Sequence, residues 1–562
     1  MNSLIQYIKI RTAYTRSINL LRDYETLELI QAYVPTSRAI QALEQIAAGL
    51  GKGSSQRALA LIGPYGSGKS AFALFLAALL SPAPSPAYRA AIAKLHEANP
   101  VLAKQFGAER IGERGFLRVP VSGIPDSLVR QLLLALARVM EQQHRVTKAE
   151  IMELRAAAQP GMALDQVVAL IRRTQQLWAT MGGTGLLIEI DELGKFLEYE
   201  SYHPQHREIH LLQLLAESAH EAHAAPLHLV VLLHQAFEYY SHRLGKSLSD
   251  EWRKVQGRFN ALAFLEPAEQ SLRIISAAFK PAQSLPDQVM VQLNQWLAVL
   301  AKVEALPTGL SEFDAQGRFG RCYPLHPLTL LILPVLCQKI AQNERTLFSY
   351  LGSVESFGLQ QRLAEMQWGD WIEPWELYDY FRLNEAGGFS DALTERRWAE
   401  VMTALERFGG SPTDPAVRLL KTVGLLNLIG AQRGLKASLT VLELLFGPQV
   451  TEWLAQLESA SILHFRQYSA EYRVWQGSDF DLPGVIQQVM AEQVAVPLVD
   501  TLNHWAPLKP VVVRRVSIVT GALRCFMPEF ADSVRYRDSL SSINQGEGTR
   551  CVKNARLPSL KK

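Results

Sequence analysis

The sequence is poor in cysteine and has no long apolar run. Its four cysteines, Cys322, Cys337, Cys525 and Cys551, lack the C-x-x-C spacing of zinc or redox sites. We expect Cys322 and Cys337 to lie reduced in a core rather than to bind metal or form a bridge. No apolar stretch approaches the roughly 18 residues that a membrane-spanning helix needs, and residues 1–13 contain no signal-peptide core. We therefore expect a protein of the cytoplasm without a membrane partner.

The chain also has little net charge. Its 562 residues are 48% hydrophobic and 20% charged, with a net charge of +3, which predicts a globular protein of about two to four domains. Residues 533–562 carry +5, so the rest of the chain carries −2. A basic tail of this kind indicates a disordered end or, alternatively, a contact with DNA.

The rest of the chain is placed relative to residues 58–80. They are predicted to form a short buried strand, a glycine-rich loop and a helix in immediate succession. The loop fills the pattern G-x-x-x-x-G-K-[ST] without a gap, and its residues, with the first of the following helix, are our predicted nucleotide contacts: Gly63, Pro64, Tyr65, Gly66, Ser67, Gly68, Lys69, Ser70 and Ala71.

The residue types in this loop fit the binding of a triphosphate. Gly63, Gly66 and Gly68 allow tight turns that point backbone N–H groups at phosphate oxygens. Lys69 is expected to contact the β- and γ-phosphates, and Ser70 to offer its hydroxyl to Mg²⁺. The N-terminal end of the next helix adds a favourable dipole. The sequence therefore predicts a P-loop that binds a nucleoside triphosphate.

A second motif predicts hydrolysis. Residues 186–190 form an apolar strand that is followed by Asp191 and Glu192. Asp191 would hold Mg²⁺ through water, and Glu192 would polarise the attacking water. Glu189 faces the other way along the strand and is expected to be structural.

Three further positions are candidate parts of the site. Residues 227–233 predict another buried strand, and His234 or Gln235 at its end is our sensor of the γ-phosphate, although polar residues at strand ends often serve only as caps. Arg258 is favoured over Arg253 as an arginine that reaches the nucleotide of a neighbouring subunit; a solvated arginine at a helix end is the alternative. Arg345 is expected to reach back to the phosphates from a lid.

The predicted fold class is α/β, with a P-loop NTPase core built on a parallel sheet of the additional-strand type. The core is followed by a helical lid, a winged-helix domain and a partial C-terminal segment. Residues 33–35 are expected to form an adenine-side wall or simply to pack in a core. The expected divisions are an N-terminal helical linker, the ATPase core, the lid, the winged-helix-like domain and the C-terminal segment, at residues 1–57, 58–266, 267–400, 401–482 and 483–562.

The predicted winged helix does not carry the charge of a typical DNA reader. Its recognition-type helix, residues 449–459, contains Glu452 and Glu458 but no lysine or arginine. We therefore favour contact with protein over contact with DNA, although Arg466 and Arg473 on the wing argue the other way. Residues 511–526 predict a strand and the start of another α/β element. The loss of apolar residues beyond Phe530 suggests a truncated or frame-altered C-terminus, or an ordinary disordered tail.

Several short stretches together resemble a known family. The resemblance rests on the segments YVPT, GPYGSGKS, LLIEIDE, LHQ and QGRF and on the lid pattern HP and QNERTLFSYL. Over residues 30–481 the chain resembles AAA+ ATPases of the initiator or STAND-like branch. The lid and the phosphate loop look most like the large ATPases of BREX-type phage-defence systems. The resemblance implies that Lys69 and Ser70 contact phosphate and Mg²⁺, Asp191 holds the metal, Glu192 is the base and Arg258 acts on a neighbouring subunit.

The sequence departs from this family at the sensor, where initiator ATPases usually have Asn, Thr or Ser and this chain has His234 and Gln235. Our leading hypothesis is an ATP- and Mg²⁺-dependent molecular switch or remodeller of a phage-defence or DNA-transaction system, with a homo-oligomer or other defence proteins as partners. The alternative is an ATP-gated DNA-binding scaffold of the replication-initiator or transposition-regulator kind with slow hydrolysis.

Overall fold

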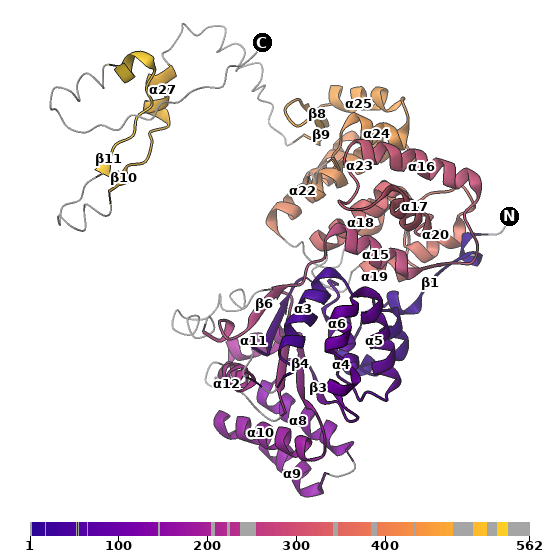
Figure 1. The fold of residues 1–562 in the computed structure, drawn as a ribbon. Helices are drawn as coiled ribbons and strands as arrows, with labels where there is room; N and C mark the ends of the chain where they lie inside the picture. Colours follow the sequence, from indigo (N-terminus) through magenta and orange to yellow (C-terminus); the bar gives the residue numbers. More distant parts are fainter. Residues whose placement is uncertain are drawn as a thin grey trace. The chain divides into compact units, whose positions relative to one another are not determined.

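The computed structural model describes most of the chain in two compact units, Met1–Gln476 and Gly477–Lys562 (Figure 1). The described residues are 3–16, 18–51, 53, 56–64, 66–143, 146–203, 208–221, 225–235, 254–340, 347–383, 391–430, 434–475, 498–513 and 525–537. Within them, every helix is too short or too polar to cross a lipid bilayer. Each unit is described separately below.

The first unit is built on a parallel sheet of five strands, in the order β3-β4-β5-β2-β6. Strand β5 lies between β2 and β4, which is the additional-strand arrangement that the sequence predicted, so the predicted α/β class is confirmed. The strands are β2 (Ala58–Ile62), β3 (Phe116–Ser122), β4 (Gly185–Asp191), β5 (Leu227–Leu233) and β6 (Asn260–Ala263).

Helices cover both faces of this sheet, which is why its strands are apolar on both sides. Alternate strand residues point to opposite faces; Leu59 packs with one helix layer and Ala60 with the other. The first layer contains α3 (Ser37–Ala48), α4 (Lys69–Leu79), α5 (Pro86–Ala98), α6 (Pro100–Gln105) and α7 (Ala108–Ile111). The second contains α8 (Leu128–Glu141), α9 (Lys148–Ala157), α10 (Leu164–Thr180), α11 (Leu193–Tyr202) and α12 (Ile209–His220).

The rest of this unit is mainly helical and shares one hydrophobic core from Leu272 to Val474. One helix, α22, spans the expected boundary between residues 400 and 401. The elements are α15 (Ala268–Ala278), β7 (Phe279–Pro281), α16 (Asp287–Lys302), α17 (Glu312–Arg321), α18 (Pro327–Ile340), α19 (Leu347–Gly352), α20 (Leu359–Glu365), α21 (Pro374–Leu383), α22 (Ala392–Phe408), α23 (Pro415–Ile429), α24 (Leu439–Phe446), α25 (Val450–Ser459), β8 (Leu463–Arg466) and β9 (Glu471–Val474).

The last five of these elements follow the order of a winged helix. Helices α23, α24 and α25 precede the antiparallel pair of β8 and β9, in which Leu463 lies opposite Val474. Asn427 joins the pair to α23, since its Oδ1 accepts a hydrogen bond from the backbone N–H of Val474 at 3.0 Å. The assignment of these elements to a winged-helix domain stays a prediction, as do the expected domain boundaries.

The N-terminal segment contains a strand that the sequence analysis did not anticipate. Strand β1 (Ile8–Ile10) pairs antiparallel with β7, and the backbone N–H of Leu4 donates to the oxygen of Met366 at 2.9 Å. Leu4 and Ile8 are buried in the core of the helical half. The short helices α1 (Leu20–Asp23) and α2 (Leu27–Ala32) then bring the chain to α4. This N-terminal segment thus contacts both halves of the first unit.

The second unit has little regular structure within the described residues. It contains α27 (Leu498–Trp505) and the antiparallel pair β10 (Val511–Val512) and β11 (Cys525–Phe526). Strand β10 lies at the start of residues 511–526, where a strand was expected, and it pairs with β11 at the end of that stretch. Residues 514–524 lie outside the described part of the chain, so the expected α/β element stays a prediction. Residues 538–562, most of the basic tail, lie outside the described part of the chain.

The N-terminal segment supplies a stability test. We expect Leu4→Ala to lower the free energy of unfolding by about 2–5 kcal/mol, because Leu4 is fully buried and its truncation leaves a cavity. Ile5→Ala is the matched control: Ile5 is 39% exposed, and its truncation should cost less than about 1 kcal/mol. Urea unfolding followed by circular dichroism measures both. Equal small effects would contradict the packing of this segment into the helical half.

Candidate functional site

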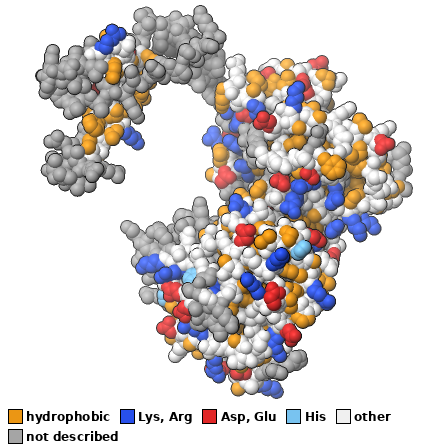
Figure 2. Space-filling view, viewed as in Figure 1, with side chains coloured by type: hydrophobic (Ala, Val, Ile, Leu, Met, Phe, Trp, Pro, Cys, Tyr) orange, Lys and Arg blue, Asp and Glu red, His pale blue; other side chains and the backbone are white. Residues whose placement is uncertain are grey.

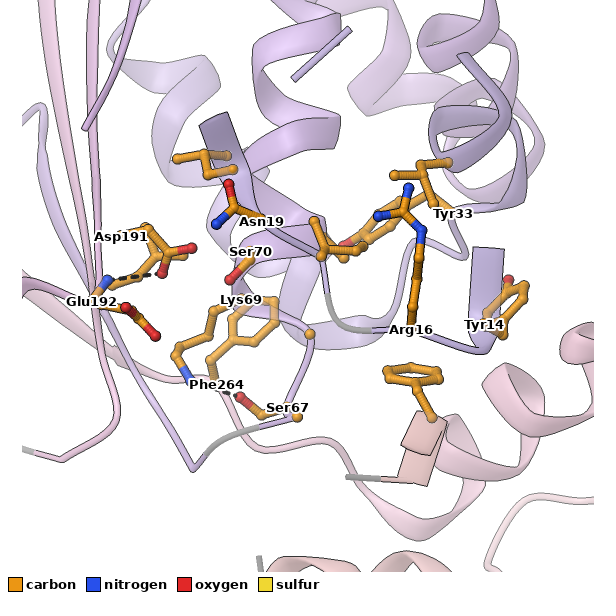
Figure 3. Close-up of a pocket in the computed structure, with 18 of the residues that line it drawn as sticks. Tyr14, Arg16, Asn19, Tyr33, Ser67, Lys69, Ser70, Asp191, Glu192 and Phe264 are labelled. Carbon is orange, nitrogen blue, oxygen red and sulfur yellow. Dashed lines mark hydrogen bonds between the residues drawn. The ribbon is translucent and has the colours of Figure 1, made fainter. Parts of the chain in front are cut away.

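A cavity of about 1310 Å³ lies at the carboxyl ends of the sheet strands (Figure 3). Its lining includes residues at or just beyond the ends of β3, β4, β5 and β6: Ser122, Asp191, His234 and Phe264. In open α/β sheets, ligands bind at this edge. The loop between β2 and α4 lines the same cavity with Gly66, Ser67 and Gly68, and the first turn of α4 lines it with Lys69, Ser70 and Ala71.

Close packing around Gly63 fixes the start of the glycine-rich loop. Its backbone N–H donates to the oxygen of Leu233 at 3.0 Å, and a Cβ atom at this position would lie 2.4 Å from the oxygen of Phe264. Gly66 and Gly68 have φ angles of 74° and 89°, in the left-handed region that favours glycine. Glycine is therefore required at Gly63 by the closeness of two neighbouring strand ends, and it is favoured at Gly66 and Gly68 by their left-handed backbone conformation. Tyr65 lies outside the described residues.

The Lys69 ammonium is folded back over this loop. Its Nζ donates to the oxygens of Gly63 at 2.5 Å and Pro64 at 2.8 Å, and to Ser67 Oγ at 3.2 Å. Burial lowers the pKa of Lys69 to about 8, while the nearby carboxylates of Asp191 and Glu192 oppose the shift. The loop thus holds a buried cation with partners that a phosphate group is able to replace.

The structure places Ser70 and Asp191 together. Asp191 is the last residue of β4, and its carboxylate accepts a hydrogen bond from the backbone N–H of Glu192 at 2.9 Å. The Ser70 side chain lies near the same carboxylate. Burial raises the pKa of Asp191, and the neighbouring Ser70 hydroxyl opposes that rise. A hydroxyl and a carboxylate are therefore side by side next to the lysine, as Figure 3 shows.

Glu192 follows Asp191 in a left-handed conformation, with φ of 51°. Its Oε2 accepts a hydrogen bond from Lys195 Nζ at 2.5 Å, and both side chains line the cavity. Gly123 packs against this turn: its N–H donates to the oxygen of Asp191 at 2.8 Å, and a Cβ there would lie 2.1 Å from the oxygen of Glu192. Sequence reasoning missed Gly123 and Lys195; a glycine shortly after the apolar stretch of residues 116–121 was the available signal.

Of the two sensor candidates, His234 lines the cavity and Gln235 is not among its lining residues. Burial lowers the pKa of His234, and the positive charge of Lys69 lowers it further. A histidine with a lowered pKa is neutral at pH 7, so it can donate a hydrogen bond from one ring nitrogen and accept with the other.

The opposite side of the cavity is formed by the N-terminal segment. Tyr33 lines it and also stacks on Phe75 of α4, with ring centroids 4.4 Å apart, so it contributes both to a wall and to core packing. Arg16 and Arg22 line the cavity as well, and both bind the carboxylate of buried Asp23 at 3.0 and 2.8 Å. Two arginines on one carboxylate leave a net positive charge beside the cavity.

Arg258, the arginine expected to act on a neighbouring subunit, does not line the cavity of its own chain. Arg258 lies just before β6, at the edge where the sheet strands begin, and its Nη2 is 3.1 Å from Glu217 Oε1 of α12. Its side chain is half exposed. Arg253 and Arg345 lie outside the described residues.

The packing of Gly63 gives a direct test of the loop geometry. We expect Gly63→Ala to weaken the binding of a fluorescent ATP analogue at least about tenfold, since the added methyl group collides with the backbone of Phe264. Gly51→Ala is the control, because a Cβ at Gly51 meets no atom within 4 Å. Unchanged binding by Gly63→Ala would show that this close contact does not shape the site.

The chain matches no protein-family model, and no curated protein is similar to it in sequence. Among solved structures, it is similar to Cdc6p from Pyrobaculum aerophilum, with 14% identity, coverage of 87% of this chain and 100% of that chain, and a TM-score of 0.32. It is also similar to the ORC2 protein of Aeropyrum pernix in its ADPNP–ADP complexes, with 12% identity, 86% and 100% coverage, and a TM-score of 0.29. With scores this low, these likenesses do not place the chain in a family.

Proposed function

We propose that this chain binds ATP with Mg²⁺ and hydrolyses it, as an AAA+-like molecular switch or remodeller. One observation carries the proposal: the glycine-rich loop with Lys69, the Ser70 and Asp191 pair and the Glu192 carboxylate all meet at one edge of a parallel sheet. Each motif occurs alone in many proteins, but their meeting in one cavity fits phosphoryl transfer to water.

The residues present fit a magnesium ion. The Ser70 hydroxyl and the Asp191 carboxylate lie near each other in the cavity, and hydroxyl and carboxylate oxygens are ligands that Mg²⁺ prefers when phosphate oxygens complete its shell. We expect Ser70 to contact the ion directly and Asp191 to hold it through water. When bound, the ion neutralises charge on the phosphate oxygens.

The chain's own residues would divide the remaining work. The loop N–H groups and Lys69 would hold the phosphates, and His234 would donate a hydrogen bond to the γ-phosphate or the attacking water. Glu192 would orient that water and accept its proton. Lys195 forms an ion pair with Glu192 beside the phosphate loop. This ion pair would be lost when Glu192 accepts a proton and becomes neutral.

A complete site would require a second subunit. Arg258 is directed away from the cavity of its own chain, and we propose that it stabilises charge on a nucleotide bound by a neighbouring copy. Its ion pair with Glu217 would break in that assembly. Arg345 as a lid sensor is proposed from the sequence resemblance alone, as is a role in phage defence.

The alternative, an ATP-gated DNA-binding scaffold, gains little from the predicted winged helix. The exposed residues of α25 include Glu452 and Glu458, and Arg473 on β9 is bound to Glu471 at 2.9 Å. On the face shown in Figure 2, basic and acidic side chains of the first unit are interspersed. Filter binding of duplex DNA across salt concentrations separates the two functions, because phosphate contacts give a steep dependence on salt.

The assignment of the base has its own test. Glu192→Gln should bind ATP normally and release phosphate at least about 100-fold more slowly, because the amide cannot accept the proton of the attacking water. The matched control is Glu198→Gln, which alters an exposed glutamate of the same helix outside the cavity. Phosphate release by Glu192→Gln at the rate of the unaltered protein would contradict the assignment of Glu192 as the base.

A further inference from the structure

A single carboxylate, that of Glu266, lines the cavity beyond the end of β6. Its Oε1 accepts a hydrogen bond from Thr36 Oγ1. Thr36 is itself fixed, because its Oγ1 also accepts from the backbone N–H of Ala39 at 3.2 Å and so caps the start of α3. The orientation of the Glu266 carboxylate is therefore set by a helix cap.

The second oxygen of this carboxylate, Oε2, is buried and has no hydrogen-bond partner among the described residues. Two arginines influence its charge, Arg38 and Arg273. Their Nη1 atoms donate to Gln41 and Gln270, and Arg38 Nε is itself buried without a hydrogen-bond partner among the described residues. Buried oxygens in native proteins are rarely left without a donor. A ligand that brings its own N–H group would satisfy Oε2.

The neighbouring walls suit a flat aromatic ring. Besides Glu266, the cavity is lined by Tyr33, Val34, Phe264, Ile274 and Phe348. Stacking on Phe75 holds the Tyr33 ring in place. Figure 3 shows Tyr33 and Asp191 on opposite sides of Ser70, so a nucleotide whose phosphates lie near Ser70 and Asp191 would extend its base toward the aromatic wall.

We propose that Glu266 sets base specificity by accepting a hydrogen bond at Oε2 from the exocyclic amino group of adenine. This inference rests on the proposed function, since it requires that the cavity bind a nucleoside triphosphate. Hypoxanthine has a carbonyl oxygen where adenine has its amino group, so its nucleotide would bring an acceptor against an acceptor. Thr36 acts as the positioning residue for this contact.

The test is competition by ATP and by ITP against a ribose-labelled fluorescent ATP in the presence of Mg²⁺. In the unaltered protein, ATP should compete at least about tenfold more effectively than ITP, because the ITP carbonyl oxygen would face the acceptor Oε2 at the position where ATP has its donor. Glu266→Gln should bring the two within about threefold, since an amide can turn its donor toward the ITP oxygen. Glu269→Gln is the control: Glu269 pairs with Arg318 and does not line the cavity.

The outcomes separate this inference from the one on which it rests. Equal competition by ATP and ITP in the unaltered protein would overturn the role of Glu266 while leaving triphosphate binding intact. An unchanged ATP preference in folded Glu266→Gln would overturn it as well. Failure of the unaltered protein to bind the labelled nucleotide would overturn the proposed function itself. The comparison of ATP with ITP in the unaltered protein requires no variant, so it tests the role of Glu266 even if Glu266→Gln does not fold.

Discussion

Strand β2 is the constraint on which the site depends. It is hydrogen-bonded to β5 on one side and to β6 on the other, so the loop that follows it begins between two neighbouring strand ends. Gly63 has room there only because it lacks a side chain. The same parallel order brings the end of β4, with Asp191, to the edge where α4 presents Ser70. Buried sheet pairing thus positions polar groups that come from distant parts of the sequence.

Three parts of the first unit supply the walls of the cavity. The α/β half provides the phosphate loop and the acidic pair, the N-terminal segment provides Tyr33 and Arg16, and the helical half provides Ile274 and Phe348. The N-terminal segment joins the other two parts, because β1 pairs with β7 while Tyr24 donates to buried Glu189 of β4 at 2.8 Å. A ligand that fills this cavity would therefore touch all three of these parts.

The sequence predicted best what is encoded locally. The glycine-rich loop and the Asp191 and Glu192 pair are short patterns whose chemistry depends on adjacent residues, and the buried strands around them are continuous apolar runs. Their element types and their parallel sheet are confirmed. The expectation that Glu189 faces the other way is wrong, because residues two apart on a strand share a face and Glu189 lies two residues before Asp191. Its burial, its bond from Tyr24 and its absence from the cavity lining fit the expected structural role.

What escaped prediction depends on contacts between distant residues. Strand β1 is only three residues long and has no readable period without its partner β7. Gly123 packs against Glu192, and Glu266 accepts a hydrogen bond from Thr36. Both partners lie far away in sequence, so neither contact can be predicted from the neighbouring residues. The pairing between the two ends of residues 511–526 was not predicted, because apolar content alone does not reveal which strands pair. The roles of the site residues stay predictions until they are measured.

The most direct test of the account is equilibrium binding of ATP in Mg²⁺ by isothermal titration calorimetry. The unaltered protein and Lys94→Ala, which removes a surface lysine paired with Glu97, should both bind ATP. Lys69→Ala should lose binding by at least about 100-fold, because the buried ammonium and its charge-assisted contacts with phosphate are gone. Equal binding by Lys69→Ala and the unaltered protein would contradict the assignment of this cavity as an ATP site.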